Sequence, residues 1–285
     1  VENSKRDAQV CMTFANSGPL PLLFANALFV GGQGGVEEDV TACISFYLLG
    51  WSPTFWSYGR YLVGTYGGDS DSLDGSLSKN SCERLWDGIK DFGKQVKKVF
   101  APPIIGSTLG IVIGSLPFLR DGMLETDGIL YPLFGAMDTL GSAYLPSVIL
   151  VLAGSLVGGS KKGNPTGSTK RPTDASLDIT TLVSILLSRF ALAPVASIAV
   201  VYLLTRVNLL PPVGTRTHAI VSFVMLMEGC MPPAQNSILM LQLEGLTARA
   251  GNMARTVTLI YVLSVLPVTV WLMCMMGMSG VMAFR

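Results

Sequence analysis

The chain has 285 residues, of which 49% are hydrophobic and only 14% are charged, and its formal net charge is +1. Its mean hydropathy is +0.50. Because soluble domains carry roughly 25% charged residues, this composition excludes an ordinary soluble protein, and the near-neutral charge argues against a nucleic-acid partner. The charged residues separate long apolar runs, which is typical of a membrane protein with several spans.

The cysteines and the single histidine offer little chemistry. The five cysteines show no CxxC spacing, and all but Cys82 lie inside apolar runs, where cysteine acts as a small apolar packing residue. His218 stands alone at the edge of an apolar run. The sequence therefore predicts no catalytic residue, no metal site and no cofactor.

The first apolar run, residues 10–30, has about the 20 residues that cross a bilayer, but the segment 16–21 (NSGPLP) interrupts it. A proline inside a helix removes a backbone donor, and its ring clashes with the carbonyl four residues back. In hydrocarbon the freed backbone is tolerated only where protein buries it or a wet cavity adjoins it. We therefore predict a broken span at residues 10–30, followed by an ordinary span at residues 40–64.

Residues 65–98 form the longest polar stretch. Its second part, residues 82–98, places apolar residues among lysines at a spacing that fits an amphipathic helix on the membrane surface; a solvated linker is the alternative. Further spans are predicted at residues 100–119, 129–158 and 179–204, the second of them bent near Gly141. A polar turn (120–128) and a basic loop (159–178) separate these spans.

A second interruption lies in the apolar run of residues 218–243, where the segment 231–237 reads MPPAQNS. Two adjacent prolines cannot continue a helix. A broken membrane helix with two amide side chains at the break is a candidate binding site. The alternative is a proline kink whose amides bond to neighbouring helices. A final span is predicted at residues 257–276.

These runs give seven spans in all. Lysine and arginine are concentrated on one side of this order, which predicts that this side is cytosolic and that the C-terminus faces the lumen or the exterior. The two broken spans run in opposite directions, as inverted repeats require. Residues 99–285 hold a complete five-helix repeat, residues 65–98 a cytosolic polar loop, and residues 1–64 the last two spans of a matching repeat. The predicted fold class is an all-α polytopic, inverted-repeat carrier whose first three helices are missing.

The two interruptions resemble those of the auxin efflux carrier family, and within it the PIN-LIKES branch with its fungal relatives. Residues 15–22 (ANSGPLPL) are similar to the first crossover motif Gly-Asn-x-Gly-Asn-Leu-Pro-Leu, although Pro19 stands where the second asparagine is common. Residues 232–236 (PPAQN) are similar to Pro-Pro-Ala-Met-Asn of the branch. Weaker similarities cover residues 140–158 and the Arg189-Phe190-x-x-x-Pro194 piece.

The resemblance implies a carrier of two inverted repeats that moves auxin-like organic anions by alternating access. The broken helices would cross at mid-membrane, and the N-termini of their halves would present backbone donors to a carboxylate. Asn16 and Asn236 would orient that carboxylate or an indole N–H. The implied substrate-binding residues are Asn16, Ser17, Pro19, Pro21, Pro232, Pro233, Gln235 and Asn236.

Two ionisable residues inside predicted spans are further candidates, because charges within a membrane are functional by default. Glu228 is expected either to couple protons or to serve as a structural acceptor. Arg189 is expected either to attract an anion or to pair with an acid such as Glu228.

The resemblance implies an endoplasmic reticulum membrane more than a plasma membrane. The implied partners are a small auxin-like organic anion, the lipid bilayer and, if the chain forms a homodimer, a second copy. Other possibilities stay open: a non-transporting truncated or degenerate copy, or a channel-like or receptor membrane protein. An intramembrane enzyme would need a catalytic pair or metal cluster that the sequence does not offer.

Overall fold

The computed structural model describes residues 2–29, 35–63, 102–125, 128–143, 146–147, 150, 153–154 and 179–284. Within these residues the structure is helical, and the only strand-like pairing is one isolated antiparallel bridge. The chain divides into two compact units, residues 1–48 with 151–285 and residues 49–150. The predicted loops at 65–98 and 159–178 lie outside the described residues.

The first predicted interruption is present, but its prolines do not lie in it. Helix α1 (Glu2–Thr13) and helix α2 (Pro19–Phe29) are separated by the non-helical residues 14–18. Pro19 begins α2 and Pro21 lies in its first turn, so the prediction that both prolines sit in the break is wrong. The physical reason is that a helix leaves its first N–H groups unpaired in any case, and proline is favoured at that position.

The next helix is longer than predicted. Helix α3 (Val36–Thr54) continues through a π-helical turn, η1 (Phe55–Gly59), into helix α4 (Arg60–Val63). It begins at Val36 and not at residue 40, because its first turn carries three acidic residues, which the positive N-terminal end of a helix stabilises. The acidic residues are Glu37, Glu38 and Asp39.

A second π-helical turn is explained by Pro194. Helix α10 (Ile179–Leu187), turn η4 (Ser188–Leu192) and helix α11 (Ala193–Arg206) are contiguous. The ring of Pro194 cannot coexist with an ordinary α-helical contact to the carbonyl of Phe190, four residues back. That carbonyl instead accepts a hydrogen bond of 2.8 Å from the Trp271 indole N–H. The wide turn thus lets a neighbouring helix satisfy the group that proline excludes.

The second interruption separates helix α12 (Arg216–Gly229) from helix α13 (Asn236–Leu243), with residues 230–235 non-helical between them. Helix α14 (Thr247–Ser279) follows, and it ends at Gly280, which adopts the left-handed conformation that glycine favours at a helix C-terminus. A short 3-10 helix, η5 (Val281–Phe284), closes the described chain.

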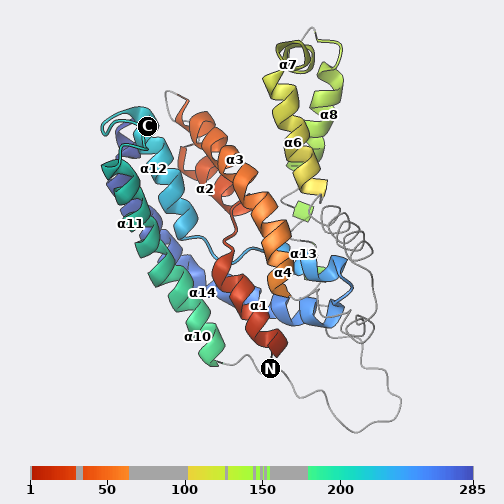
Figure 1. Cartoon of the computed structure of the whole chain (residues 1–285), viewed down its shortest axis with the longest axis vertical. Coiled ribbons are helices and arrows are strands. Elements are labelled where there is room, and N and C mark those ends of the chain that lie inside the picture. Colours follow the sequence, from red (N-terminus) through yellow and green to blue (C-terminus); the bar gives the residue numbers. More distant parts are fainter. Residues whose placement is uncertain are drawn as a thin grey trace, which may run out of the picture. The chain divides into compact units, whose positions relative to one another are not determined.

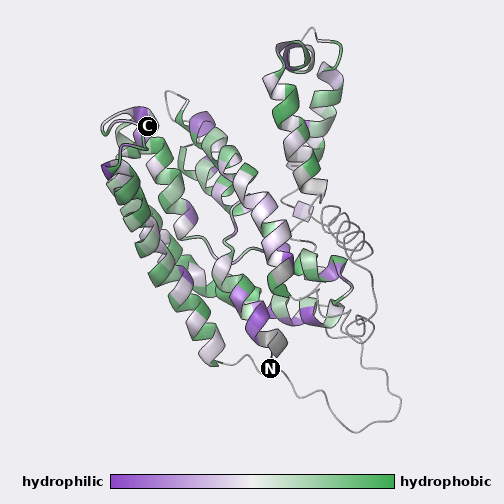
Figure 2. Ribbon diagram, in the orientation of Figure 1, coloured by the Kyte–Doolittle hydropathy of each residue, from purple (hydrophilic) through white to green (hydrophobic). Residues whose placement is uncertain are grey.

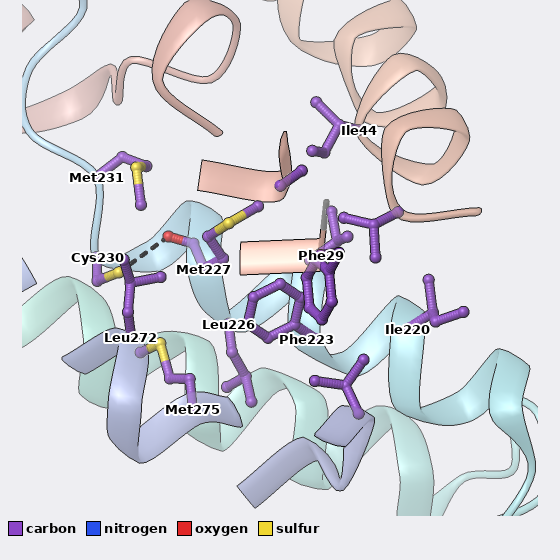
Figure 3. Packing of buried hydrophobic residues seen from close by; sticks show 14 of the residues in the cluster. Phe29, Ile44, Ile220, Phe223, Leu226, Met227, Cys230, Met231, Leu272 and Met275 are labelled. Carbon is purple, nitrogen blue, oxygen red and sulfur yellow. Dashed lines mark hydrogen bonds between the residues drawn. The ribbon is translucent and has the colours of Figure 1, made fainter. Parts of the chain in front are cut away.

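Two of these helical segments, Ile179–Arg206 and Thr247–Ser279, are long and apolar enough to cross a membrane. Figure 2 shows that α10 and α11 are hydrophobic over most of their surface. The first unit is held together by a cluster of buried apolar side chains from α2, α3, α12, α14 and η5. Phe29 and Phe223 stand at its centre with their rings edge to face (Figure 3), the ring centroids being 5.6 Å apart.

The second unit corrects two predicted boundaries. Besides the end of α3 with η1 and α4, it holds helices α6 (Pro102–Ser115), α7 (Pro117–Leu124) and α8 (Tyr131–Ser142). The residue before a proline avoids the helical region, and Leu116 is extended before Pro117, so the predicted span at 100–119 ends early. Pro117 then opens α7, and the predicted polar turn at 120–128 is wrong in its first half. Helix α8 ends beside the predicted bend at Gly141, and most of the remainder of that span lies outside the described residues.

Two ion pairs in the first unit join helix ends that are distant in sequence. Asp7 of α1 pairs with Arg249 of α14, and Asp39 of α3 pairs with Arg216 of α12, each with an N–O distance of 2.5 Å. The seven-span order places the first pair on its cytosolic side and the second pair on the opposite side. In each pair, the two partners thus lie on the same side of the membrane in this order.

Accessibility labelling should follow the same order. In a background without the natural cysteines, cysteines at Lys94, Lys162 and Asp7 should react with an impermeant reagent from one side only. Cysteines at Arg216 and Asp39 should react from the other side, because alternate spans reverse the direction of the chain. If the positions Lys94 and Lys162 are labelled from different sides, the seven-span order is wrong.

Candidate functional site

The two interruptions of the first unit lie against one another (Figure 1), and we call residues 14–18 and 230–235 the paired segments. Ala15 and Pro233 form the antiparallel bridge. The Asn16 N–H donates to the Pro232 carbonyl at 2.7 Å, and the Ala234 N–H donates to the Phe14 carbonyl at 3.0 Å. Backbone groups that the helix ends leave free thus satisfy one another, as a water-poor interior requires.

A tyrosine of α14 links the two segments through side-chain hydrogen bonds. The Asn16 Nδ2 donates to the Tyr261 hydroxyl at 2.6 Å, and that hydroxyl donates to the Pro233 carbonyl at 3.1 Å. Asn16 is 4% exposed. Tyr261 was not among the residues predicted from the sequence, where its signal is a lone tyrosine inside the last apolar run. Three elements that are far apart in sequence therefore meet at one buried amide.

Helix termini gather at the same place. Helix α2 begins at Pro19, directly after the first segment, and helix α13 begins at Asn236, directly after the second. The N-terminal end of a helix carries a partial positive charge and unpaired N–H groups, which suit an anion. Both N-termini border the paired segments and bring positive potential there. Few of their N–H groups are free, because Pro19 and Pro21 have none and the N–H groups of Leu22, Ser237 and Ile238 donate to carbonyls.

The predicted binding residues divide into three groups. Asn16, Ser17, Pro232 and Pro233 are buried within the paired segments. Gln235 and Asn236 are half-buried where α13 begins, and Pro19 and Pro21 are buried in the first turn of α2. The structure bonds Asn16 directly to Pro232 and, through Tyr261, to Pro233. The assignment of these residues to substrate remains a prediction.

Glu228 is buried in the last turn of α12, next to the second segment, and is 4% exposed. Neither carboxylate oxygen has a partner of hydrogen-bonding geometry among the described residues. The Ser17 hydroxyl lies close enough to interact with it and with the Tyr47 hydroxyl, but its one hydrogen bond of acceptable geometry goes to the Ala15 carbonyl at 3.5 Å. A helix C-terminus disfavours a negative charge, so this carboxyl is poorly placed as a structural anion.

Arg189 lies on the π-helical turn η4 and is also 4% exposed. Its Nε donates to the Cys11 carbonyl at 2.9 Å. Among the described residues no ion pair joins Arg189 to Glu228, so the expected pairing with Glu228 is wrong, and the alternative that Arg189 attracts an anion stays a prediction. The physical reason is that Cys11 lies in the last turn of α1, where a carbonyl lacks its helical partner, and the guanidinium takes that partner's place.

Comparison with known proteins agrees with a membrane carrier. Residues 91–272 match the model of a family described as membrane transport protein, which is a family of transporters and not of enzymes. The match covers more than half of the chain and includes the second paired segment, Arg189 and Tyr261, but not the first segment. No solved structure matches the chain.

Curated relatives from Arabidopsis thaliana are similar over more than half of the chain. Protein PIN-LIKES 7 is 27% identical over 184 residues, which are 64% of this chain and 42% of the relative. Protein PIN-LIKES 2 is 30% identical over 175 residues, 61% of this chain and 35% of the relative. Protein PIN-LIKES 6 is 27% identical over 154 residues, 53% of this chain and 31% of the relative.

The matched segments thus span less than half the length of the curated relatives. The family and the two long apolar helices together identify an integral membrane protein. This chain belongs to the membrane transport protein family, that of the auxin efflux carriers.

Proposed function

We propose that the chain carries auxin-like organic anions across a membrane by alternating access, with the paired segments as the substrate site. The observation that supports this most is the bridge between Ala15 and Pro233, which joins two broken helices through their backbones. In carriers of inverted repeats, broken helices place the substrate where their halves meet. The chain's membership of a transporter family agrees with this assignment.

The chemistry of the paired segments suits a carboxylate. The Asn16 Nδ2 carries a second N–H besides the one donated to Tyr261, and the N-termini of α2 and α13 add positive potential. A substrate carboxylate would accept from the Asn16 amide, and the positive potential of these helix ends would favour its charge. The backbone and Tyr261 hydrogen bonds join both segments. A movement of one broken helix would therefore displace the other.

Substrate, location and assembly are part of the same proposal. It includes an auxin-like anion as substrate, the endoplasmic reticulum membrane as location, a lumenal or exterior C-terminus and two inverted repeats. The matched segments span less than half of the relatives, so the activity of the relatives does not establish that this chain transports on its own. Transport by this chain alone is therefore part of the proposal. The alternative is a copy that binds the anion without moving it, either as a monomer or as a homodimer.

Replacing Asn236 with alanine should weaken indole-3-acetate binding by about tenfold or more. A hydrogen bond to a charged group contributes about 1.5–3 kcal/mol, and about 1.4 kcal/mol corresponds to one decade of affinity. Binding of the radiolabelled acid to the purified chain in detergent, and its uptake into proteoliposomes, measure the two steps separately. Binding without uptake would support the non-transporting alternative.

The matched control is Asn26→Ala, because Asn26 is an exposed asparagine of α2 and should leave affinity unchanged. The melting temperature of each variant reports whether the fold survives. If Asn16→Ala and Asn236→Ala together alter neither binding nor uptake, the paired segments are a structural kink and the substrate site lies elsewhere.

A further inference from the structure

Arg189 is a buried cation that no acid of the described residues pairs with. Arginine stays protonated in proteins, and its Nη2 has no hydrogen-bond partner among the described residues. The ion pairs of the described residues involve other arginines, namely Arg120, Arg216 and Arg249. An uncompensated buried charge costs several kcal/mol. A cation kept at this cost in a carrier suggests a counter-charge that arrives with a ligand.

The local structure fixes where that cation points. The π-helical turn η4 carries Arg189, and the hydrogen bond from its Nε to the Cys11 carbonyl holds one edge of the guanidinium against α1. The guanidinium is a planar, rigid fork. Holding Nε therefore also fixes the direction of the unpartnered Nη2, so the group is preorganised before any ligand binds.

The fixed cation lies near the paired segments. The turn η4 that carries it contacts α14, the helix of Tyr261. The Cys11 carbonyl to which it donates lies three residues before the first paired segment, and its charge acts on Cys11, Tyr47 and Tyr261. The Tyr261 hydroxyl is the group that accepts from Asn16 and donates to the Pro233 carbonyl. Glu228 faces Ser17 and Tyr47 and makes no ion pair with Arg189. A positive charge held on the last turn of α1 and an amide donor bonded to Tyr261 thus lie on either side of the start of the first paired segment.

We propose that Arg189 recognises the charge of the substrate, its Nη2 donating to the carboxylate of an organic acid that Asn16 and Tyr261 also contact. This inference rests on the proposed function and adds the residue that selects acids over neutral analogues. Charge-assisted hydrogen bonds from arginine to a carboxylate are about twice as strong as neutral ones. Arg189 would therefore set ligand charge selectivity, whereas Asn16 would support acid and amide alike.

The experiment compares indole-3-acetate with indole-3-acetamide, which has nearly the same shape and no charge. The wild-type chain should bind the acid at least about tenfold more tightly than the amide. Arg189→Gln should reduce the ratio of acid affinity to amide affinity to about one. The affinity for the acid should fall, while the affinity for the amide should change by less than about threefold. Arg189→Lys should retain part of the preference because it keeps the charge.

Arg255→Gln is the matched control, because Arg255 is an exposed arginine of α14 and should leave the ratio unchanged. Equal wild-type affinity for acid and amide would overturn the inference. An equal loss of affinity for the acid and the amide in folded Arg189→Gln would also overturn it, because Arg189 would then only cap the C-terminus of α1. If the wild-type chain binds neither ligand, the proposed function itself fails.

Discussion

Replacing Phe223 with alanine is expected to lower the free energy of unfolding by about 3 kcal/mol, the low end of the range for buried phenylalanines. Phe223 is 0% exposed, and its ring meets that of Phe29 edge to face at an interplanar angle of 88°. Lipid tails are as apolar as the protein interior, so the transfer contribution is small. The lost dispersion contacts and the cavity remain. Thermal or denaturant unfolding in detergent measures the change.

Two comparisons show whether the loss comes from the cluster. Phe223→Leu keeps much of the volume and should cost less than about 1.5 kcal/mol. Leu266→Ala removes an apolar side chain that is 77% exposed on α14 and should change stability by less than about 0.5 kcal/mol. If Phe223→Ala costs no more than Leu266→Ala, the cluster does not hold α2 against α12 in the way that Figure 3 indicates.

The existence of the two interruptions followed from the sequence, because proline and hydrophobic length act locally. Two adjacent prolines cannot lie in the interior of a helix, and residues 230–235 are indeed non-helical. The position of the first interruption was less predictable. Proline is excluded from a helix interior yet favoured at a helix start, and Pro19 takes the second role. Pro117 does the same in α7. A sequence pattern does not distinguish these two uses of proline.

The polar contacts of the site could not be predicted from the sequence. The Asn16–Tyr261 hydrogen bond joins residues 245 positions apart, and the partner of Arg189 is a backbone carbonyl, which every residue has. Charge alone favoured Glu228 as that partner. The structure prefers the Cys11 carbonyl because a helix that ends inside a protein leaves carbonyls that need donors. Such needs are visible only once the helix ends and their neighbours are placed in space.

Replacing Gly229 with alanine is expected to cost about 1–3 kcal/mol of stability, the usual range for an overpacked interior. A Cβ at this position would lie 2.6 Å from the Cβ and 2.4 Å from the Oγ of Ser197, and 3.4 Å from the Ala193 carbonyl oxygen. A Cβ cannot rotate away, so α11 and α12 would have to separate. Gly229 ends α12 directly before the second paired segment, and this displacement should also weaken indole-3-acetate binding. Thermal unfolding and ligand binding in detergent measure both effects.

A second substitution at Ser197 should restore the stability that Gly229→Ala loses. Ser197→Gly removes the opposing Cβ, so Gly229→Ala should cost much less in that background, and the double-mutant cycle should show a coupling of at least about 1 kcal/mol. Ser197→Ala should not rescue, because its Cβ stays at 2.6 Å from the new methyl group. Gly277→Ala on α14, where an added Cβ meets nothing within 4 Å, should be neutral or stabilise by up to about 1 kcal/mol, as alanine favours a helix over glycine. Additive effects of Ser197→Gly and Gly229→Ala would show that this close approach does not limit the packing of α11 against α12, and the glycine at the end of α12 would then serve only to stop the helix.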